Sequence, residues 1–482
     1  MTVRLDAMLF EACDRSADAI ALEDGSQHLR YGELADAARI LADTLRMQGL
    51  QADEPVLVAV ANEPRDIAAF LGVWAAGGVV IPVARDAPVT VAETTRTATG
   101  ARLWVAGPGE VRLTGHPAPP AREQLAGAAL IIFTSGSTGA PKGVVLSHAT
   151  FGYKLREIDG VLGFSSATRA LLVLQITFIF GIWFTLLALL KGGSVFMRQR
   201  FDPLAVMTDI AERRITDAAF VPTMLRRIVG TDITLLAPFR NRAGLSRIHT
   251  GGEPFNAALG QRIRDLLPKT TIVDIYGLTE TSSSDFFAVT EGDQPFSGGI
   301  GRCSASETFR IADALGREVP SGEVGELQIH TPFIMNGYLD QPQLTHNAFV
   351  GEFFRTGDLA RARPDGTTEL VGRNKDLIVR AAAKISPLEL DGLIAQHPAV
   401  AAALTVGIAD EVVGERIHVL IVPRTQNALD ENDLRSWVAE RIERFKRPDV
   451  YHFGAELPTG RTGKVDREAL RRSLTARNQP AK

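Results

Sequence analysis

A loop rich in glycine and hydroxyl residues stands between two short apolar runs, residues 131–133 and 144–146. The loop contains Thr134, Ser135, Gly136, Ser137, Thr138 and Gly139. Lys142 follows it. Glycines let backbone N–H groups approach an anion closely, hydroxyls add donors, and a lysine supplies positive charge. The composition therefore predicts a phosphate-binding loop.

This loop differs from the common nucleotide-binding P-loop, which ends in Gly-Lys-Ser/Thr and opens a helix. Pro141 precedes Lys142, and Gly143 stands where a magnesium-binding hydroxyl residue would be. The β-branched residues after the lysine favour a strand. We expect a strand–loop–strand hairpin; the alternative is an ordinary flexible surface loop.

Thr279 and Glu280 follow a turn, Tyr276-Gly277, at the end of a β-rich run. A carboxylate in such a turn can hold magnesium, and the neighbouring hydroxyl can reach a phosphate. The alternative is a glutamate that only caps a helix N-terminus. The pattern by itself leaves both interpretations open.

Two further segments carry candidate residues. Asp358 follows Gly357, and a carboxylate there could accept both hydroxyls of a ribose diol. Asp in a Gly-Asp pair is otherwise a common turn residue. Lys464 lies in a segment rich in glycine and threonine, residues 457–466, where a lysine is most often only solvated.

In this order, the segments around Lys142, Gly252, Glu280, Asp358 and Lys464 resemble the motifs of the adenylate-forming enzymes. That family includes acyl-CoA synthetases, aryl-CoA ligases, luciferases and peptide-synthetase adenylation domains. The resemblance is collinear along essentially the whole chain. It implies a stand-alone acyl- or aryl-acid AMP ligase, which joins a carboxylate to ATP, releases pyrophosphate and passes the acyl group to a thiol.

The resemblance also implies residue roles. Lys464 would be the main catalytic residue of adenylation, Glu280 would bind Mg²⁺, and Thr279 would contact the α-phosphate, with Lys142 assisting. Lys375 would be the hinge of a moving domain. The residues implied to bind ATP or AMP are Thr134, Ser135, Gly136, Ser137, Thr138, Gly139, Gly252, Glu253, Tyr276, Gly277, Asp358 and Arg373.

The implied acyl pocket is mostly apolar. Its residues would be Phe178, Ile179, Gly181, Val221, Thr250, Gly251 and Ser282, together with the nucleotide-site residues Gly252 and Tyr276. Phe178 stands where many CoA ligases have a histidine. Ile179 stands near the aspartate of amino-acid-activating relatives, and a buried ammonium without a partner would be costly. We therefore expect an aromatic or medium-chain carboxylic acid, not an α-amino acid.

The thiol channel is implied to include Ala382 and Lys384. Relatives usually have glycine near Ala382, and the added methyl group either narrows the channel or fits without effect. CoA is the expected acceptor. The alternative acceptors are the phosphopantetheine of an acyl or peptidyl carrier protein and an amine, which would give an amide. The alternative to an enzyme is a non-catalytic homologue that only binds acyl nucleotides.

The elements that must position these residues alternate between strands and helices over most of the first 300 residues, which predicts βαβ units. Short strands and turns follow to residue 371, and a fresh β–α–β pattern begins at 377. The expected fold is α/β. The large N-terminal domain, residues 1–372, would hold two α/β sheets plus a small β-barrel. A hinge at 373–376 would join it to a small mobile α+β domain, 377–482.

Composition restricts the surroundings. The chain has 482 residues and a net charge of −4, which gives no reason to expect nucleic acid or an anionic membrane as partner. Its two cysteines have no disulfide-framework or metal-ligand spacing, and the N-terminus lacks a signal-peptide pattern, so a cytoplasmic location is expected. The apolar run 170–190 contains polar residues and is expected to form a buried strand and a core helix.

Overall fold

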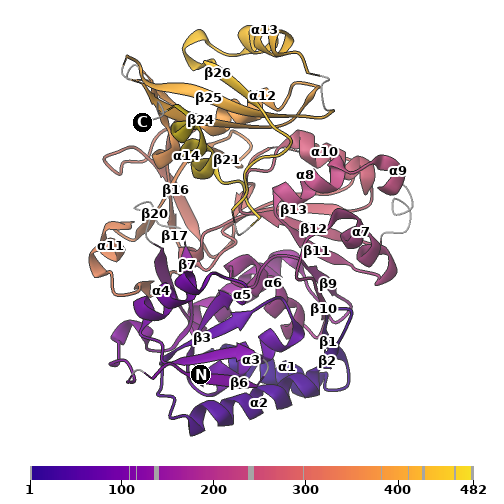
Figure 1. The fold of residues 1–482 in the computed structure, drawn as a ribbon, viewed down its shortest axis with the longest axis vertical. Helices are drawn as coiled ribbons and strands as arrows, with labels where there is room; N and C mark the ends of the chain where they lie inside the picture. Colours follow the sequence, from indigo (N-terminus) through magenta and orange to yellow (C-terminus); the bar gives the residue numbers. More distant parts are fainter. Residues whose placement is uncertain are drawn as a thin grey trace.

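The structure is a computed structural model. Along its longest axis, the N-terminal sheets lie toward one end and the C-terminal residues lie at the other (Figure 1). It describes residues 3–107, 109–115, 117–134, 141–236, 244–296, 298–380, 383–410, 412–425, 429–460 and 463–478.

One sheet has seven strands in the order β18-β8-β7-β4-β3-β5-β6. Their bounds are β3 (Pro55–Val60), β4 (Val79–Ala84), β5 (Leu103–Gly107), β6 (Glu110–Leu113), β7 (Ala128–Thr134), β8 (Lys142–Ser147) and β18 (Gly337–Tyr338). β3 pairs in parallel with both β4 and β5. The helices α3 (Pro64–Ala75) and α4 (Val89–Thr99) connect them, so the expected βαβ units are confirmed.

A second sheet has nine strands in the order β15-β14-β13-β12-β11-β9-β10-β1-β2. Their bounds are β1 (Ile20–Glu23), β2 (His28–Arg30), β9 (Arg169–Leu172), β10 (Ser194–Met197), β11 (Asp217–Phe220), β12 (Arg247–Gly251), β13 (Thr271–Tyr276), β14 (Phe286–Thr290) and β15 (Arg302–Cys303). β9 to β13 and β1 pair in parallel. Parallel strands end at one edge of their sheet, and ligands commonly bind there.

Helices cover both sheets and fill the space between them. Their bounds are α1 (Leu5–Arg15), α2 (Tyr31–Met47), α5 (His148–Leu162), α6 (Ile179–Leu190), α7 (Pro203–Glu212), α8 (Pro222–Gly230), α9 (Ile233–Leu236) and α10 (Ala257–Leu266). One hydrophobic core joins residues of both sheets. The apolar run 170–190 forms β9 and the buried helix α6, as expected. No helix of the described ranges is long and apolar enough to cross a membrane.

Several helices begin at a side-chain cap that the sequence supplies. The Ser147 hydroxyl accepts from the Thr150 N–H and starts α5 directly after β8. The Asn256 side chain accepts from the Leu259 N–H and starts α10 shortly after β12. Such caps satisfy backbone donors that the first helical turn leaves free. They fix where the chain leaves the two sheets near the candidate site.

The third sheet is antiparallel and lies where the small β-barrel is expected. Its strands are β16 (Thr308–Ala312), β17 (Val324–His330), β19 (Phe349–Val350), β20 (Phe353–Ala362) and β21 (Thr368–Arg373). Its order is β16-β17-β20-β19, and β21 also pairs with β20, so the described pairing branches rather than closes. The short helix α11 (Pro342–Asn347) precedes β19.

The C-terminal residues form a fourth sheet with its own hydrophobic cores at one end of the molecule (Figure 1). Its strands are β22 (Ile378–Arg380), β23 (Ala383–Ile385), β24 (Val400–Asp410), β25 (Gly414–Pro423) and β26 (Val450–Phe453). Its helices are α12 (Pro387–Ile394), α13 (Glu431–Arg441) and α14 (Arg467–Asn478). This is the small α+β unit that the sequence predicts; the domain boundaries at 373–376 stay a prediction.

Candidate active site

The strands on either side of the glycine-rich loop pair with each other. β7 and β8 are antiparallel, and Thr134 lies directly opposite Lys142, which confirms the strand–loop–strand hairpin. The ammonium of Lys142 lies over the ring of Tyr338, 5.1 Å from its centre. The predicted phosphate-binding residues between the strands lie outside the described residues: Ser135, Gly136, Ser137, Thr138 and Gly139.

Glu280 shares Tyr338 with the lysine of this hairpin. It lies in a short 3₁₀ turn, η3 (Thr279–Thr281), after β13. The Tyr338 hydroxyl donates to the Glu280 carboxylate at 2.9 Å. Burial raises the pKa of Glu280, while the Tyr338 hydrogen bond and the charge of Lys142 act in the opposite direction. The structure thus brings together the two motifs that contain Lys142 and Glu280.

The backbone after Glu280 is unusually constrained. Ser282, Ser283 and Ser284 have φ angles of 61°, 76° and 60°, in the left-handed region that non-glycine residues rarely occupy. A Cβ on Gly277 would lie 2.0 Å from the Ser284 nitrogen, so the chain folds back where only glycine fits. Strain of this kind gathers at functional sites. This strained turn was not predicted from the sequence.

A buried ionic cluster is bonded to the same loop. The Lys154 ammonium on α5 lies 3.0 Å from Asp285 and 2.5 Å from Glu307, with both carboxylates fully buried. The Thr281 hydroxyl donates to Asp285 at 2.6 Å. This cluster was not predicted from the sequence. Its signal was a lysine three residues after Phe151, on the apolar face of a helix, where lysine is rare unless paired.

Asp358 is held by residues from two other strands. The Tyr276 hydroxyl donates to one carboxylate oxygen at 2.7 Å, and the Arg373 Nε donates to the other at 2.6 Å. Asp358 and Arg373 are register partners on β20 and β21. The charge of Asp358 raises the pKa of Arg373. Three residues predicted to contact the nucleoside are therefore adjacent.

Lys464 reaches this region from the C-terminal unit. Its carbonyl accepts from the Gly460 N–H at 2.8 Å, within a tight turn. A Cβ on Gly252 would lie 2.5 Å from the Lys464 Nζ, so the lysine packs on a glycine whose φ is 77°. Burial lowers the pKa of Lys464, Glu253 raises it, and the positive charge of Arg373 lowers it further.

The residues predicted for the acyl pocket come from neighbouring elements of the nine-stranded sheet and from the loop after β13. Phe178 and Val221 precede α6 and α8, and Thr250 is buried in β12. Two of the glycines have clear packing reasons. A Cβ on Gly181 would lie 2.7 Å from the Gln175 carbonyl oxygen, and one on Gly251 would lie 2.3 Å from that of Ile275.

The remaining predicted residues fall into three groups. Ile179 is buried in the first turn of α6, and the Ser282 hydroxyl donates to the Phe333 carbonyl at 2.7 Å. Lys375, in the 3₁₀ turn η4 (Asn374–Asp376), and Lys384, on β23, are both exposed. Ala382 lies outside the described residues.

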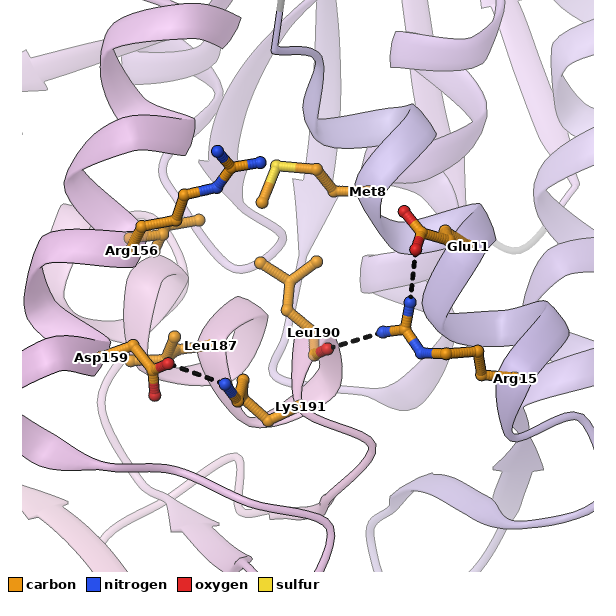
Figure 2. A pocket seen from close by; sticks show the side chains of 9 residues that line it. Met8, Glu11, Arg15, Arg156, Asp159, Leu187, Leu190 and Lys191 are labelled. Atoms are coloured by element: carbon orange, nitrogen blue, oxygen red, sulfur yellow. Dashed lines mark hydrogen bonds and ion pairs between the residues drawn. The ribbon is translucent and has the colours of Figure 1, made fainter.

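A separate hollow of about 200 Å³ lies between α1, α5 and the end of α6 (Figure 2). Four of its charged side chains form ion pairs: Lys191 pairs with Asp159, and Arg15 pairs with Glu11. It contains none of the residues that the sequence singled out. We therefore do not regard it as the candidate active site.

Comparison with known proteins identifies the family. The AMP-binding enzyme family matches residues 9–126 and 84–339, and its C-terminal domain family matches residues 389–464. The chain therefore belongs to the AMP-binding enzyme family, whose members are AMP-forming ligases. The predicted family and fold class are confirmed.

Individual relatives cover nearly the whole chain. Feruloyl-CoA synthase of Amycolatopsis sp is 29% identical over 480 residues, which is 95% of this chain and 96% of that protein. The ATP-bound crystal structure of MatB from Rhodopseudomonas palustris has a TM-score of 0.87 at 22% identity and covers 99% of this chain and 100% of its own. The structure of amide bond synthetase McbA from Marinactinospora thermotolerans has a TM-score of 0.84 at 23% identity. The match covers 98% of this chain and 99% of that one.

Proposed function

We propose that this chain activates a carboxylic acid with ATP, forming an acyl-adenylate and pyrophosphate, and then transfers the acyl group to the thiol of CoA. The position of Lys464 supports the proposal most strongly. The lysine packs on Gly252, at the edge where β12 ends, and the charge of Arg373 beside Asp358 reaches it. Residues from both parts of the chain therefore converge where an ATP phosphate and a ribose could lie.

In the proposed first step, a carboxylate oxygen of the acid attacks the α-phosphorus of ATP. The bond from that phosphorus to the oxygen bridging the α- and β-phosphates breaks, and pyrophosphate leaves with the bond's electron pair. Negative charge grows on the bridging oxygen, and the Lys464 ammonium would stabilise it electrostatically. Positioning and electrostatics suffice for such a step, so no covalent enzyme intermediate is required.

The proposal places Mg²⁺ with the nucleotide. Across the described residues, no group of three or more His, Cys, Asp or Glu side chains could hold a metal by itself. Magnesium in nucleotide sites commonly takes one or two carboxylates together with phosphate oxygens and water, so one glutamate is an adequate donor set. Glu280 would supply the carboxylate, and the ion would neutralise phosphate charge.

The acid is proposed to be aromatic or medium-chain. The predicted pocket residues Ile179 and Val221 are apolar and buried, and they would pack on an apolar acyl group. A feruloyl-CoA synthase among the relatives makes ferulate a reasonable first candidate. The pocket offers no acidic side chain among its predicted residues, so an α-amino acid is a poor substrate in this proposal.

In the proposed second step, a thiol sulfur attacks the acyl carbonyl carbon of the adenylate. The bond from that carbon to the phosphate oxygen breaks, and AMP leaves. CoA is the proposed acceptor. The phosphopantetheine of a carrier protein is an alternative with the same thiol chemistry. A third acceptor is an amine, and the similarity of the fold to an amide bond synthetase keeps that possibility in the test.

The test is pyrophosphate release with a panel of acids: ferulate, benzoate, octanoate and phenylalanine, each with and without CoA. We expect acid-dependent release with an aromatic or medium-chain acid, acceleration by CoA, and an acyl-CoA product by mass spectrometry. Release that stops after one turnover despite CoA would instead favour a carrier protein or an amine. No release with any acid would contradict the proposed activity.

A further inference from the structure

Glu253 connects the C-terminal unit to the large domain beside Lys464. The backbone N–H of Val465 donates to Oε1 of Glu253 at 2.5 Å. Val465 directly follows Lys464, so this bond fixes the main chain at the point where the lysine side chain begins. Gly463 also lies near the large domain, because a Cβ built on it would come within 3.4 Å of the end of the Met224 side chain.

The other oxygen of Glu253 is bound within the large domain. It accepts from the Thr223 N–H and the Thr223 hydroxyl, each at 2.8 Å, and from Arg226 at 3.1 Å. Thr223 and Arg226 belong to the first turns of α8, where a carboxylate is favoured by the helix dipole. The Glu253 side chain is only 5% exposed. Its position is therefore set by the large domain, whether or not the C-terminal unit is docked.

We infer that Glu253 is a positioning residue that holds Lys464 in the arrangement for adenylate formation, and that breaking its bond to Val465 accompanies the change to the second half-reaction. The inference rests on the proposed function and deepens it. It also gives the Glu253 side chain a task different from the nucleotide contact that the family resemblance implies. Thr223 and Arg226 remain as partners when the Val465 N–H leaves.

The charge of Glu253 supports the same task. Burial lowers the pKa of Lys464; among the charged groups that act on it, Glu253 favours the ammonium form and Arg373 opposes it. A carboxylate that anchors the loop and favours the charged form of the lysine would matter while charge develops on the leaving pyrophosphate. It would matter little once the loop has moved away.

A purely structural role makes a different prediction. If Glu253 only caps α8 and pairs with Arg226, its loss would weaken the large domain and lower both half-reactions together. The half-reactions can be measured separately: adenylation by pyrophosphate exchange, and transfer by mixing synthetic acyl-adenylate with CoA. Their ratio distinguishes a positioning residue from a stabilising one.

The test compares Glu253→Gln with the natural chain, using the most active acid of the panel. Glutamine keeps the shape but has only one accepting oxygen, so it cannot accept from both the Val465 N–H and the Thr223 N–H. A hydrogen bond to a charged acceptor is among the stronger kinds, so we expect its loss to lower pyrophosphate exchange roughly ten- to hundredfold. Transfer from synthetic acyl-adenylate should be unchanged, and Glu253→Asp should recover part of the exchange.

The matched control is Glu326→Gln. Glu326 is also nearly buried, with 9% of its side chain exposed, and it pairs with Arg355 at 3.0 Å, away from the Lys464 loop. We expect this variant to leave the ratio of the two half-reactions unchanged. An equal loss of both half-reactions in Glu253→Gln, or full retention of exchange, would overturn the inference.

Hydrogen–deuterium exchange of the substrate-free chain gives a second readout that needs no activity. In Glu253→Gln, peptides covering residues 457–470 should exchange faster, while those of β24 and β25 should not change. Unchanged protection of the loop would also overturn the inference. If the natural chain showed no pyrophosphate exchange with any acid, the proposed function would fail, but this comparison would still decide whether Glu253 holds the loop.

Discussion

At the scale of single residues, Lys464 is the residue on which the proposed adenylation depends most. It is the candidate cation for the leaving pyrophosphate, and it belongs to the C-terminal unit. We expect Lys464→Ala to lower acid-dependent pyrophosphate exchange by about a hundred- to a thousandfold, because one well-placed donor or charge is worth a few kcal/mol in such a site. ATP binding, followed by calorimetry, should remain. Near-normal exchange would refute the assignment.

The protonation of Lys464 gives a second residue-scale prediction. Burial lowers its pKa from the ordinary value of 10.5, so the cationic form is lost at a lower pH than for a solvated lysine. Adenylation should therefore decline as pH rises through that lowered pKa. Lys464→Arg keeps its charge throughout, and what activity it retains should lack this alkaline decline. A shared alkaline limb in the two pH–rate profiles would assign the decline to another group.

The contacts of Asp358 predict how ATP binding responds to substitution. Its two oxygens are held by Tyr276 and Arg373, so the carboxylate is fixed before a ribose arrives. Asp358→Asn should raise the KM for ATP about ten- to hundredfold, since a charged acceptor is lost. Tyr276→Phe removes one holding bond but keeps the ring, and its effect should be smaller. A larger effect from Tyr276→Phe would contradict this order.

At the scale of elements, the buried cluster of Lys154, Asp285 and Glu307 joins α5, the loop after Glu280 and the loop before β16. One cation faces two buried carboxyl groups. Burial, together with the charge of Asp285, raises the pKa of Glu307 to about 8. Such a cluster is costly to break, because removing one partner leaves a buried charge without compensation.

This cluster predicts a pH dependence of stability. Between the ordinary value of 4.5 and about 8, the folded chain keeps the Glu307 proton while the unfolded chain releases it. Stability from this group is therefore full below pH 4.5 and falls as pH rises to 8. Glu307→Gln should flatten the fall of the thermal unfolding midpoint across that window. Glu326→Gln is the control, and an equally steep fall in Glu307→Gln would disprove the assignment.

At the scale of the whole molecule, the C-terminal unit is docked with Lys464 against the large domain. The Ser386 hydroxyl, which caps α12, donates to the Val371 carbonyl just before the predicted hinge. Movement to a second arrangement would have to change this contact and the bond between Val465 and Glu253. The proposed two-step reaction therefore depends on the freedom of residues 373–376.

The hinge prediction can be tested by restricting its backbone. Proline fixes φ, so Lys375→Pro should limit rotation about this point. We expect pyrophosphate exchange to persist, since the docked arrangement is the one observed, and transfer from synthetic acyl-adenylate to CoA to be strongly reduced. Lys384→Ala, an exposed change on β23, tests whether the thiol channel is affected instead. Normal transfer in Lys375→Pro would place the hinge elsewhere.

Much of this architecture could be predicted from local patterns. The hairpin at Lys142 followed from Pro141 and the β-branched residues, and the buried strand and helix of 170–190 followed from an apolar run with a few polar interruptions. Lys154 was predictable in principle, because it interrupts the apolar face of α5. Its partners were not, since Asp285 and Glu307 lie 131 and 153 residues away in the sequence.

The sequence by itself determined the family, the alternation of strands and helices, and the residue types available for phosphate and ribose chemistry, because these depend on short-range spacing. Only the tertiary structure decided which of those residues meet. In the structure, Lys464 packs on Gly252, and the Val465 N–H donates to the Glu253 carboxylate. Tyr276 and Arg373 donate to the two oxygens of Asp358. Such contacts depend on how sheets and helices pack across hundreds of residues, and no local pattern specifies them.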